Sequence, residues 1–522
     1  MKLSALRRLV VCTLPALLAL TGPAITSATA AAGPTAATGK VCGDATANYE
    51  TATPEQAGLD PEKLWHALNL MSVNGSETVQ VFRNNCLVGS GIFDPLFGAV
   101  PSNNWSQTKT ITALLVGRAV TLGRLSVDDP IDRYLPPGLG DAAHRAVTVR
   151  QLLTQTSGIH MNWGRELNLA MPDRIREFMA LPFDHQPGTF FRYDQIGPSV
   201  VAYVVQRAVG DDLQDFAQRE LFTPIGIPRS SWFWLRDRSG HTDGWSNLFL
   251  PGGQFGRVGQ LLLNQGTFHG RRLISADYLR QLRTPTPTNP GYGFLTWLNA
   301  GQHWITPSAF AAADNPAPMI PSAPEDMYLS YGFFGQHIFV LPSVGMVVTR
   351  SSGSLLWPPS RTDVSDPLTA VLPGQPGRVE YEFFKLLMEA VRSPRQPQAK
   401  PYVPPKPGAV DPTLIINPAD NLALADLGPT APKGCTILGC DGKLAVTGTV
   451  RSVMDIPRAG VAAVTALPAG LTQLATQVPD LLPRLLDGWE QTARITGRHL
   501  PEILPNLLGS LRQTLSSLQQ GH

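Results

Sequence analysis

Alternating apolar and polar positions predict two hairpins, one near each end of a large unit. Residues 77–83 and 86–92 have the pattern of two strands, and Asn84-Asn85 between them is a tight-turn pair. Residues 336–341 and 345–350 repeat the pattern, with Pro342-Ser343-Val344 as the connection. We expect these strands to lie in one antiparallel sheet.

Apolar residues at helical spacing occupy the sequence between and after the hairpins. The expected helices include residues 149–153, 199–209, 257–263 and the amphipathic stretch 381–391. Strands at both ends with helices between them indicate an α+β fold. In this fold an antiparallel sheet, whose first and last strands meet, is flanked by helices beside an inserted helical subdomain.

Composition divides the chain into an expected leader, one large globular unit, a linker and an extension. Residues 46–392 have the mixed pattern of one globular unit, and prolines crowd residues 393–414 as in a stiff linker. Residues 415–522 read as a C-terminal, mostly helical extension of unknown function. Its leucines recur near helical spacing, interrupted by prolines, at Leu471, Leu474, Leu481, Leu482, Leu485, Leu486, Leu504, Leu507, Leu508 and Leu511. Such helices either pack on the protein or lie on a membrane or envelope surface.

The first thirty residues predict export. Arg7 and Arg8 precede an apolar run, and Ala28-Thr29-Ala30 resembles a cleavage site, so residues 1–30 fit a signal peptide of a secreted or extracytoplasmic protein. The alternative is a helix that is not cleaved and stays in the membrane.

Cysteine usage agrees with that compartment. Four cysteines follow the leader, and of the three possible pairings we favour Cys42 with Cys86 and Cys435 with Cys440, because the predicted linker separates the two sets. No histidine accompanies either pair at ligand spacing, so we expect no metal site.

Charge excludes one class of partner. The 42 basic and 40 acidic residues give a net charge of +2, without a basic stripe, so nucleic acid is not an expected partner.

One lysine suggests chemistry. Lys109 is the only lysine between Lys63 and Lys385, and it follows Ser106 by three residues at the start of a helical pattern that we expect an asparagine to cap. Residues i and i+3 share a helix face, so the amine can reach the hydroxyl. Burial and the helix N-terminus both favour a neutral lysine, which can act as a base. The alternative is an ordinary helix start with a solvated lysine.

Two later stretches can complete such a site. Tyr193 and Gln195 follow the turn at Pro187-Gly188, and a phenol beside a lysine ammonium can lower its pKa enough to exchange protons. Ser330, Gly332 and Phe333 lead into the second hairpin, where glycine permits a close approach of a ligand to backbone N–H groups. A core tyrosine and simple turn geometry are the alternatives.

Together these motifs resemble the serine β-lactamase and penicillin-binding-protein-like hydrolases, in the branch with class C β-lactamases, secreted esterases and 6-aminohexanoate-dimer hydrolases. The likeness covers about residues 50–392. It depends on the order and spacing of Ser106-Gln107-Thr108-Lys109, Leu125 to Pro130, Tyr134-Leu135-Pro136, Val147 to Gly158, Pro187 to Tyr193 and Gly335-Gln336. A β-lactamase/transpeptidase-like fold is implied.

The resemblance also implies roles. Ser106 would form an acyl-enzyme, Lys109 would be its base, and Tyr193 would shuttle the proton. Backbone N–H groups of Ser106 and Phe333 would form the oxyanion hole. Gln195, Ser330 and Gly332 would line the site, without metal or organic cofactor.

Two departures direct the substrate prediction. Gln195 stands where the family often has asparagine, and Ser330-Tyr331-Gly332 lacks the cation with which many β-lactamases bind the substrate carboxylate. A small-molecule ester or amide is therefore the expected substrate. A D,D-peptidase or weak β-lactamase is one alternative, and a catalytically silent protein associated with the cell envelope through the C-terminal region is another.

Overall fold

A six-stranded antiparallel sheet organises the protein. The computed structural model describes residues 39–496 except 167–171, 301–302, 308–311, 353–376, 394–397, 407, 410, 415–416, 424 and 426, and the described residues all belong to one compact unit. The strand order is β2-β1-β13-β12-β11-β8. These strands are β1 (Thr78–Arg83), β2 (Cys86–Ser90), β8 (Trp297–Leu298), β11 (Tyr328–Gly332), β12 (Gln336–Leu341) and β13 (Met346–Ser351).

Both predicted hairpins are confirmed. Asn84 and Asn85 have φ angles of 48° and 66° and turn β1 back into β2. A 3₁₀ turn at Pro342–Val344 joins β12 to β13. The first and last hairpins meet, as expected, because β1 pairs with β13 through Val81 opposite Val348.

Alternate residues of the strands point into two hydrophobic clusters. On β12, Phe339 and Leu341 belong to one cluster, together with residues of α1 (Pro61–Val73) and α12 (Arg378–Ala390). Ile338 and Val340 belong to the other, together with residues of α10 (Phe255–Leu263). The period of two in β12 therefore buries both faces of the sheet.

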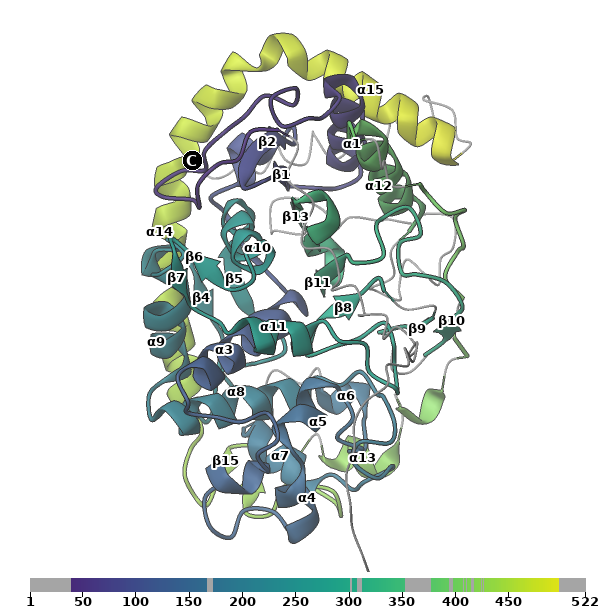
Figure 1. Ribbon diagram of the computed structural model, residues 1–522. Coiled ribbons are helices and arrows are strands. Elements are labelled where there is room, and N and C mark those ends of the chain that lie inside the picture. The colour runs from purple at the N-terminus through teal and green to yellow at the C-terminus, as the bar shows by residue number, and fades with distance from the viewer. Residues whose placement is uncertain are drawn as a thin grey trace, which may run out of the picture. The chain divides into compact units, whose positions relative to one another are not determined.

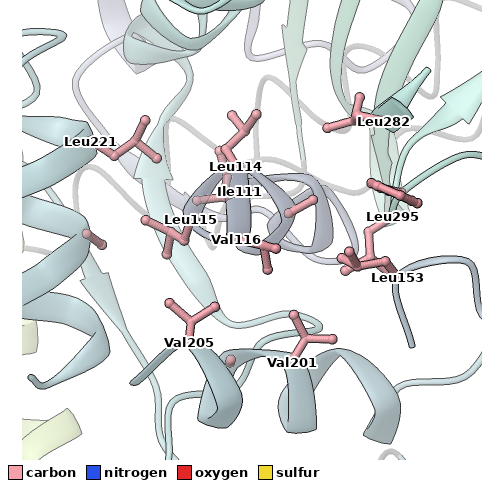
Figure 2. Close-up of a cluster of buried hydrophobic side chains, with 14 of the residues drawn as sticks. Ile111, Leu114, Leu115, Val116, Leu153, Val201, Val205, Leu221, Leu282 and Leu295 are labelled. Carbon is pink, nitrogen blue, oxygen red and sulfur yellow. The ribbon is translucent and has the colours of Figure 1, made fainter. Parts of the chain in front are cut away.

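Between β2 and β8 the chain forms a largely helical subdomain around α3 (Gln107–Thr121). Figure 2 shows Ile111, Leu114, Leu115 and Val116 of α3 among side chains that include Val201 and Val205 of α8 (Ile196–Val209). The other helices here are α2 (Asp94–Phe97), α4 (Ala142–Ala146), α5 (Val149–Leu153), α6 (Trp163–Glu166), α7 (Arg174–Ala180), α9 (Leu213–Ala217) and α11 (Ala276–Leu282).

Several short strands lie between β2 and β11 in the chain. β3 (Pro101–Asn103) pairs with β5 (Leu248–Pro251), which also pairs with β4 (Phe233–Trp234). Two-stranded pairs are made by β6 (Thr267–Phe268) with β7 (Arg271–Arg272) and by β9 (Trp304–Ile305) with β10 (Asp314–Asn315). The fold is thus α+β, as the sequence predicts.

The described C-terminal part contains α13 (Pro418–Ala423), the hairpin of β14 (Cys435–Thr436) and β15 (Gly439–Cys440), α14 (Thr447–Thr476) and α15 (Val478–Thr496). Figure 1 draws α14 and α15 in yellow. Among the described helices, α14 alone is long and apolar enough to cross a membrane, and only 11% of its most apolar stretch is buried.

Both favoured disulfides, Cys42–Cys86 and Cys435–Cys440, are present. The expected leader and the leucines after residue 496 lie outside the described residues. The predicted boundaries of the leader, linker and extension stay predictions.

Candidate active site

A tight turn between β3 and α3 presents Ser106. Trp105 has a left-handed backbone with φ of 47°, and its N–H donates to Asn103 Oδ1 at 2.9 Å. The helix begins at Gln107 with Ser106 as the N-cap residue, so neither Asn103 nor Asn104 caps it, and the expected asparagine cap is wrong. The Ser106 hydroxyl makes no capping hydrogen bond. Asn103 holds the turn instead, so the hydroxyl stays available to a neighbouring side chain.

Lys109 lies one turn along α3 with its amine against that hydroxyl. Lys109 Nζ is 3.1 Å from Ser106 Oγ, and the side chain is only 1% exposed. The amine also donates to Gln195 Oε1 and, at 3.3 Å, to the Trp245 carbonyl oxygen. A neutral amine has two N–H donors and one lone pair, and both carbonyl oxygens can only accept. The two N–H groups therefore point at Gln195 and Trp245, which leaves the lone pair to face Ser106.

The surroundings of Lys109 favour this neutral form. Burial lowers the pKa of Lys109 to about 7, while the charges of Asp194 and Glu166 oppose the shift. Burial also acts on those carboxyl groups, raising the pKa of Asp194 to about 6 and that of Glu166 well above its ordinary value. Near pH 7 the amine is thus uncharged in a substantial fraction of molecules.

Tyr193 lies beside Ser106 and Lys109, as expected, but the pKa of its phenol is shifted in the opposite direction to the one expected. Its side chain hydrogen-bonds with Ser106, and Lys109 Nζ lies 4.6 Å from the centre of its ring. Burial raises the pKa of Tyr193 above its ordinary value, despite the opposing effect of the Ser106 hydrogen bond. The sequence analysis expected a lowered pKa from a lysine ammonium. That expectation is wrong, because the same burial removes water from the phenol and disfavours the charge on the lysine.

Gln195 is held from a second side. Its backbone N–H donates to Glu166 Oε2, and the side chain is 2% exposed at the start of α8. The Gln195 side-chain amide reaches Lys109 Nζ, so the glutamine at this position supplies an acceptor for the amine.

The end of β11 lies directly beside the Ser106 turn. A Cβ atom on Gly332 would lie 2.3 Å from the Asn104 carbonyl oxygen, so only glycine fits there. Ser330 shares that face of the strand, since residues i and i+2 point the same way. The Ser330 hydroxyl is buried without a hydrogen-bond partner in the described structure.

Three aromatic rings border this junction. The Trp105 ring lies 5.7 Å from Phe333 and 5.4 Å from Phe334. Phe334, like Trp105, has a left-handed backbone, with φ of 61°. Such conformations cost roughly 1–3 kcal/mol, which the packing of the rings offsets in part.

Three groups of the site were not anticipated from the sequence. Trp245 contributes its backbone carbonyl group, which every residue type has, so the sequence cannot indicate this role. Glu166 and Asp194 do not belong to any motif that the sequence analysis could use. Their burial, with Glu166 only 1% exposed, is visible only in the structure. Ser106 and Lys109 could be found because they are three residues apart on one helix. Residues that come from separate elements have no such fixed spacing in the sequence.

A second cluster of ligand-type side chains has a structural role. Oxygen or nitrogen atoms of Asp173, Asp237 and His241 lie within 4.8 Å of one another. Asp237 accepts from the backbone N–H groups of Arg174, Gly240 and His241, and Asp173 caps α7. Burial lowers the pKa of His241, but Asp237 and Asp173 more than offset this and raise it to about 9, which indicates an imidazolium in an ion-pair network.

Parts of this chain are similar to known proteins. The sequence profile of the Beta-lactamase family matches residues 102–365, half of the chain. Esterase EstB of Burkholderia gladioli is 30% identical over 141 residues, 23% of this chain and 36% of that protein. The lovastatin esterase of Penicillium rubens is 27% identical over 215 residues, 34% of this chain and 53% of that protein. The chain therefore spans about a third to a half of the length of these curated relatives.

Among solved structures, the D-stereospecific amidohydrolase of a Streptomyces species aligns with a TM-score of 0.38 and 18% identity, over 56% of this chain and 94% of that one. The segment matched by the family profile includes Ser106, Lys109, Tyr193, Gln195 and the end of β11. The chain therefore belongs to the Beta-lactamase family of serine hydrolases.

Proposed function

We propose that the protein hydrolyses an ester or a small amide through an acyl-enzyme on Ser106. The observation that carries the proposal is the buried Lys109 amine, 3.1 Å from Ser106 Oγ, with Gln195 and Trp245 as acceptors for its two N–H groups. A serine hydroxyl needs such a base, and a lysine can be one only when neutral.

In the proposed reaction Lys109 and Tyr193 carry the protons that acylation and deacylation require. Lys109 Nζ takes the hydroxyl proton as Ser106 Oγ attacks the substrate carbonyl, and the resulting oxyanion accepts from the backbone N–H groups of Ser106 and Phe333. Tyr193 gives its phenol proton to the leaving oxygen or nitrogen and regains a proton from Lys109. A raised pKa suits this role because the phenol starts protonated. Water then attacks the acyl-enzyme, and the same groups return the proton to Ser106.

The absence of a cation in the Ser330-Tyr331-Gly332 stretch supports an uncharged substrate. His337, which follows on β12, is buried, and burial lowers its pKa well below the ordinary value, so its ring is neutral at pH 7. A β-lactam carboxylate would lose a charge-assisted hydrogen bond worth about 1.5–3 kcal/mol. The esterase names of the two curated relatives point in the same direction.

Export belongs to the proposal as well. The leader pattern of residues 1–30 and the two disulfides, Cys42–Cys86 and Cys435–Cys440, fit an oxidising, extracytoplasmic compartment.

One preparation of residues 31–522 tests the chemistry. It is expected to hydrolyse short-chain nitrophenyl esters and to react with a fluorophosphonate probe, and Ser106→Ala should abolish both. Lys109→Ala and Tyr193→Phe should each slow acylation by at least about 10²-fold, because each transfers a proton. Ser126→Ala, at an exposed serine, is the matched control and should behave as the parent.

The alternatives give different results in the same assay. Release of terminal D-alanine from a D-alanyl peptide, or labelling by a fluorescent penicillin faster than ester turnover, would favour a peptidase or β-lactamase. A folded protein that no probe acylates would favour a catalytically silent binding protein. An unchanged rate in Ser106→Ala would reject the assignment.

A further inference from the structure

The helix α14 presents its large hydrophobic side chains to solvent. Six of them form what we call the outer face, and each is 48–70% exposed: Val450, Val453, Met454, Val461, Val464 and Leu471. Each lies three, four or seven residues from another of the set, which places them on one side of the helix. Surface helices of soluble proteins bury such a stripe against the core, so the orientation of α14 is reversed.

Small residues form the opposite, inner face, and they hold α14 against the body of the protein along its length. A Cβ atom on Gly448 would lie 1.7 Å from the Asp237 carbonyl oxygen, and one on Gly470 would lie 2.1 Å from that of Pro95. Between them, Ser452 Oγ accepts from the Arg236 N–H at 3.1 Å. A helix fixed near both ends in this way lies along the protein surface, so it is not placed to span a bilayer by itself.

Positive charge flanks the outer face in the N-terminal half of α14. Arg451 and Arg458 are 58% and 62% exposed along their side chains, and they pair only loosely, at 3.6 Å with Asp212 and 3.7 Å with Asp455. Both border a cleft of about 800 Å³ that three further arginines line, Arg219, Arg229 and Arg236, against the three carboxylates of Asp212, Asp215 and Asp455. From Ala459 to Thr476 the helix has no charged residue.

We propose that the outer face of α14 lies on an anionic phospholipid surface, with the apolar side chains at the boundary of headgroups and acyl chains. Arg451 and Arg458 then contact lipid phosphates from the edge of the helix. A protein partner fits less well, because α14 contains no tryptophan or tyrosine, two of the residue types in which protein interfaces concentrate their binding energy. This inference goes beyond the proposed function and does not depend on it.

Vesicle flotation tests the inference. Residues 31–522 are used, because the expected apolar leader would bind lipid by itself, and the described residues all belong to one compact unit. The protein should float with vesicles of phosphatidylglycerol and phosphatidylcholine. Val461→Asp with Val464→Asp should lower the bound fraction by at least about 10-fold, since each places a charge at the apolar boundary. Val41→Asp, at a valine that is 65% exposed elsewhere, is the matched control and should bind as the parent.

The arginines have their own readout. Arg451→Gln with Arg458→Gln should weaken binding by about 10-fold or more and reduce its salt dependence, because each arginine near an anionic surface adds to the electrostatic attraction. Circular dichroism and thermal unfolding of each variant verify that the fold is kept.

Three outcomes would overturn the proposal. The first is equal flotation of the parent and the Val461→Asp/Val464→Asp variant, and the second is equal binding to vesicles of phosphatidylcholine alone. The third is sedimentation of the parent as a dimer that the valine substitutions dissociate, without vesicle binding, which would show that a second copy of the chain covers the outer face.

Discussion

At the scale of single residues, the direction in which the Lys109 lone pair points decides the chemistry. The carbonyl oxygens of Gln195 and Trp245 accept hydrogen bonds from the two N–H groups of Lys109, and burial lowers the pKa of the amine to about 7. The spacing of Ser106 and Lys109 was sufficient to predict their contact. The acceptors were not fully predictable, because Trp245 acts through its backbone and Gln195 arrives from another helix.

Gln195→Glu tests this arrangement. A carboxylate in place of the amide stabilises the lysine ammonium, and an opposite charge at this range raises a lysine pKa by roughly 1–3 units. Since only the neutral amine is a base, the rising limb of kcat/KM, expected near pH 7 in the parent, should move to higher pH. A rate profile over pH 5–10 measures the shift. Gln265→Glu, the same change at an exposed glutamine, should leave the limb in place, and an unmoved limb in Gln195→Glu would contradict the role given to this amide.

At the scale of elements, the site depends on the close approach of β11 to the Ser106 turn. Hydrophobic periodicity correctly predicted both hairpins and the pairing of β1 with β13. It also predicted α12, which packs Phe384 against Phe339 of the sheet. Periodicity describes one element at a time, so it gave no indication of how tightly β11 and the turn before α3 meet.

Gly332→Ala tests that contact. The added methyl group would meet backbone at 2.3 Å and must push β11 away from Ser106. Overpacking of this kind costs about 1–3 kcal/mol, and a displacement near 1 Å lowers turnover by about 10²-fold. Ester kinetics and thermal unfolding measure the two effects.

The control for this substitution is Gly460→Ala within α14, where a Cβ would meet nothing within 4 Å. It should leave turnover unchanged and stabilise the protein by up to about 1 kcal/mol. Full activity in Gly332→Ala would show that the strand end does not shape the site.

At the scale of the whole molecule, the C-terminal helices differ most from what the sequence suggested. Pro468 and Pro483 read as interruptions, yet both lie inside helices. In α14 the carbonyl groups that Pro457 and Pro468 leave without a helical N–H donor belong to Val453 and Val464, and both residues are exposed, so water can supply the donor. Leucine spacing shows which residues share a face but not which face is covered, so the outward direction of the α14 stripe was not predictable.

The two disulfides should contribute unequally to the stability of the whole chain. Cys42 and Cys86 are separated by 44 residues, whereas Cys435 and Cys440 are separated by five. Loop entropy gives about 4 kcal/mol for the longer loop and about 2 kcal/mol for the shorter. Urea unfolding of Cys42→Ala/Cys86→Ala should therefore show the larger loss of stability, with Cys435→Ala/Cys440→Ala as the comparison. The reverse order would contradict the loop argument.

The most direct test of the account is the rate at which Ser106 is acylated as a function of pH, followed by intact mass with a fluorophosphonate or a slow ester. We expect one covalent adduct, on the peptide that contains Ser106, with a rate that rises through pH 7 as Lys109 loses its proton and then levels off. The rise should disappear in Lys109→Ala. An adduct on another residue, or a rate on Ser106 that does not change with pH between 5 and 9, would contradict a neutral lysine as the base.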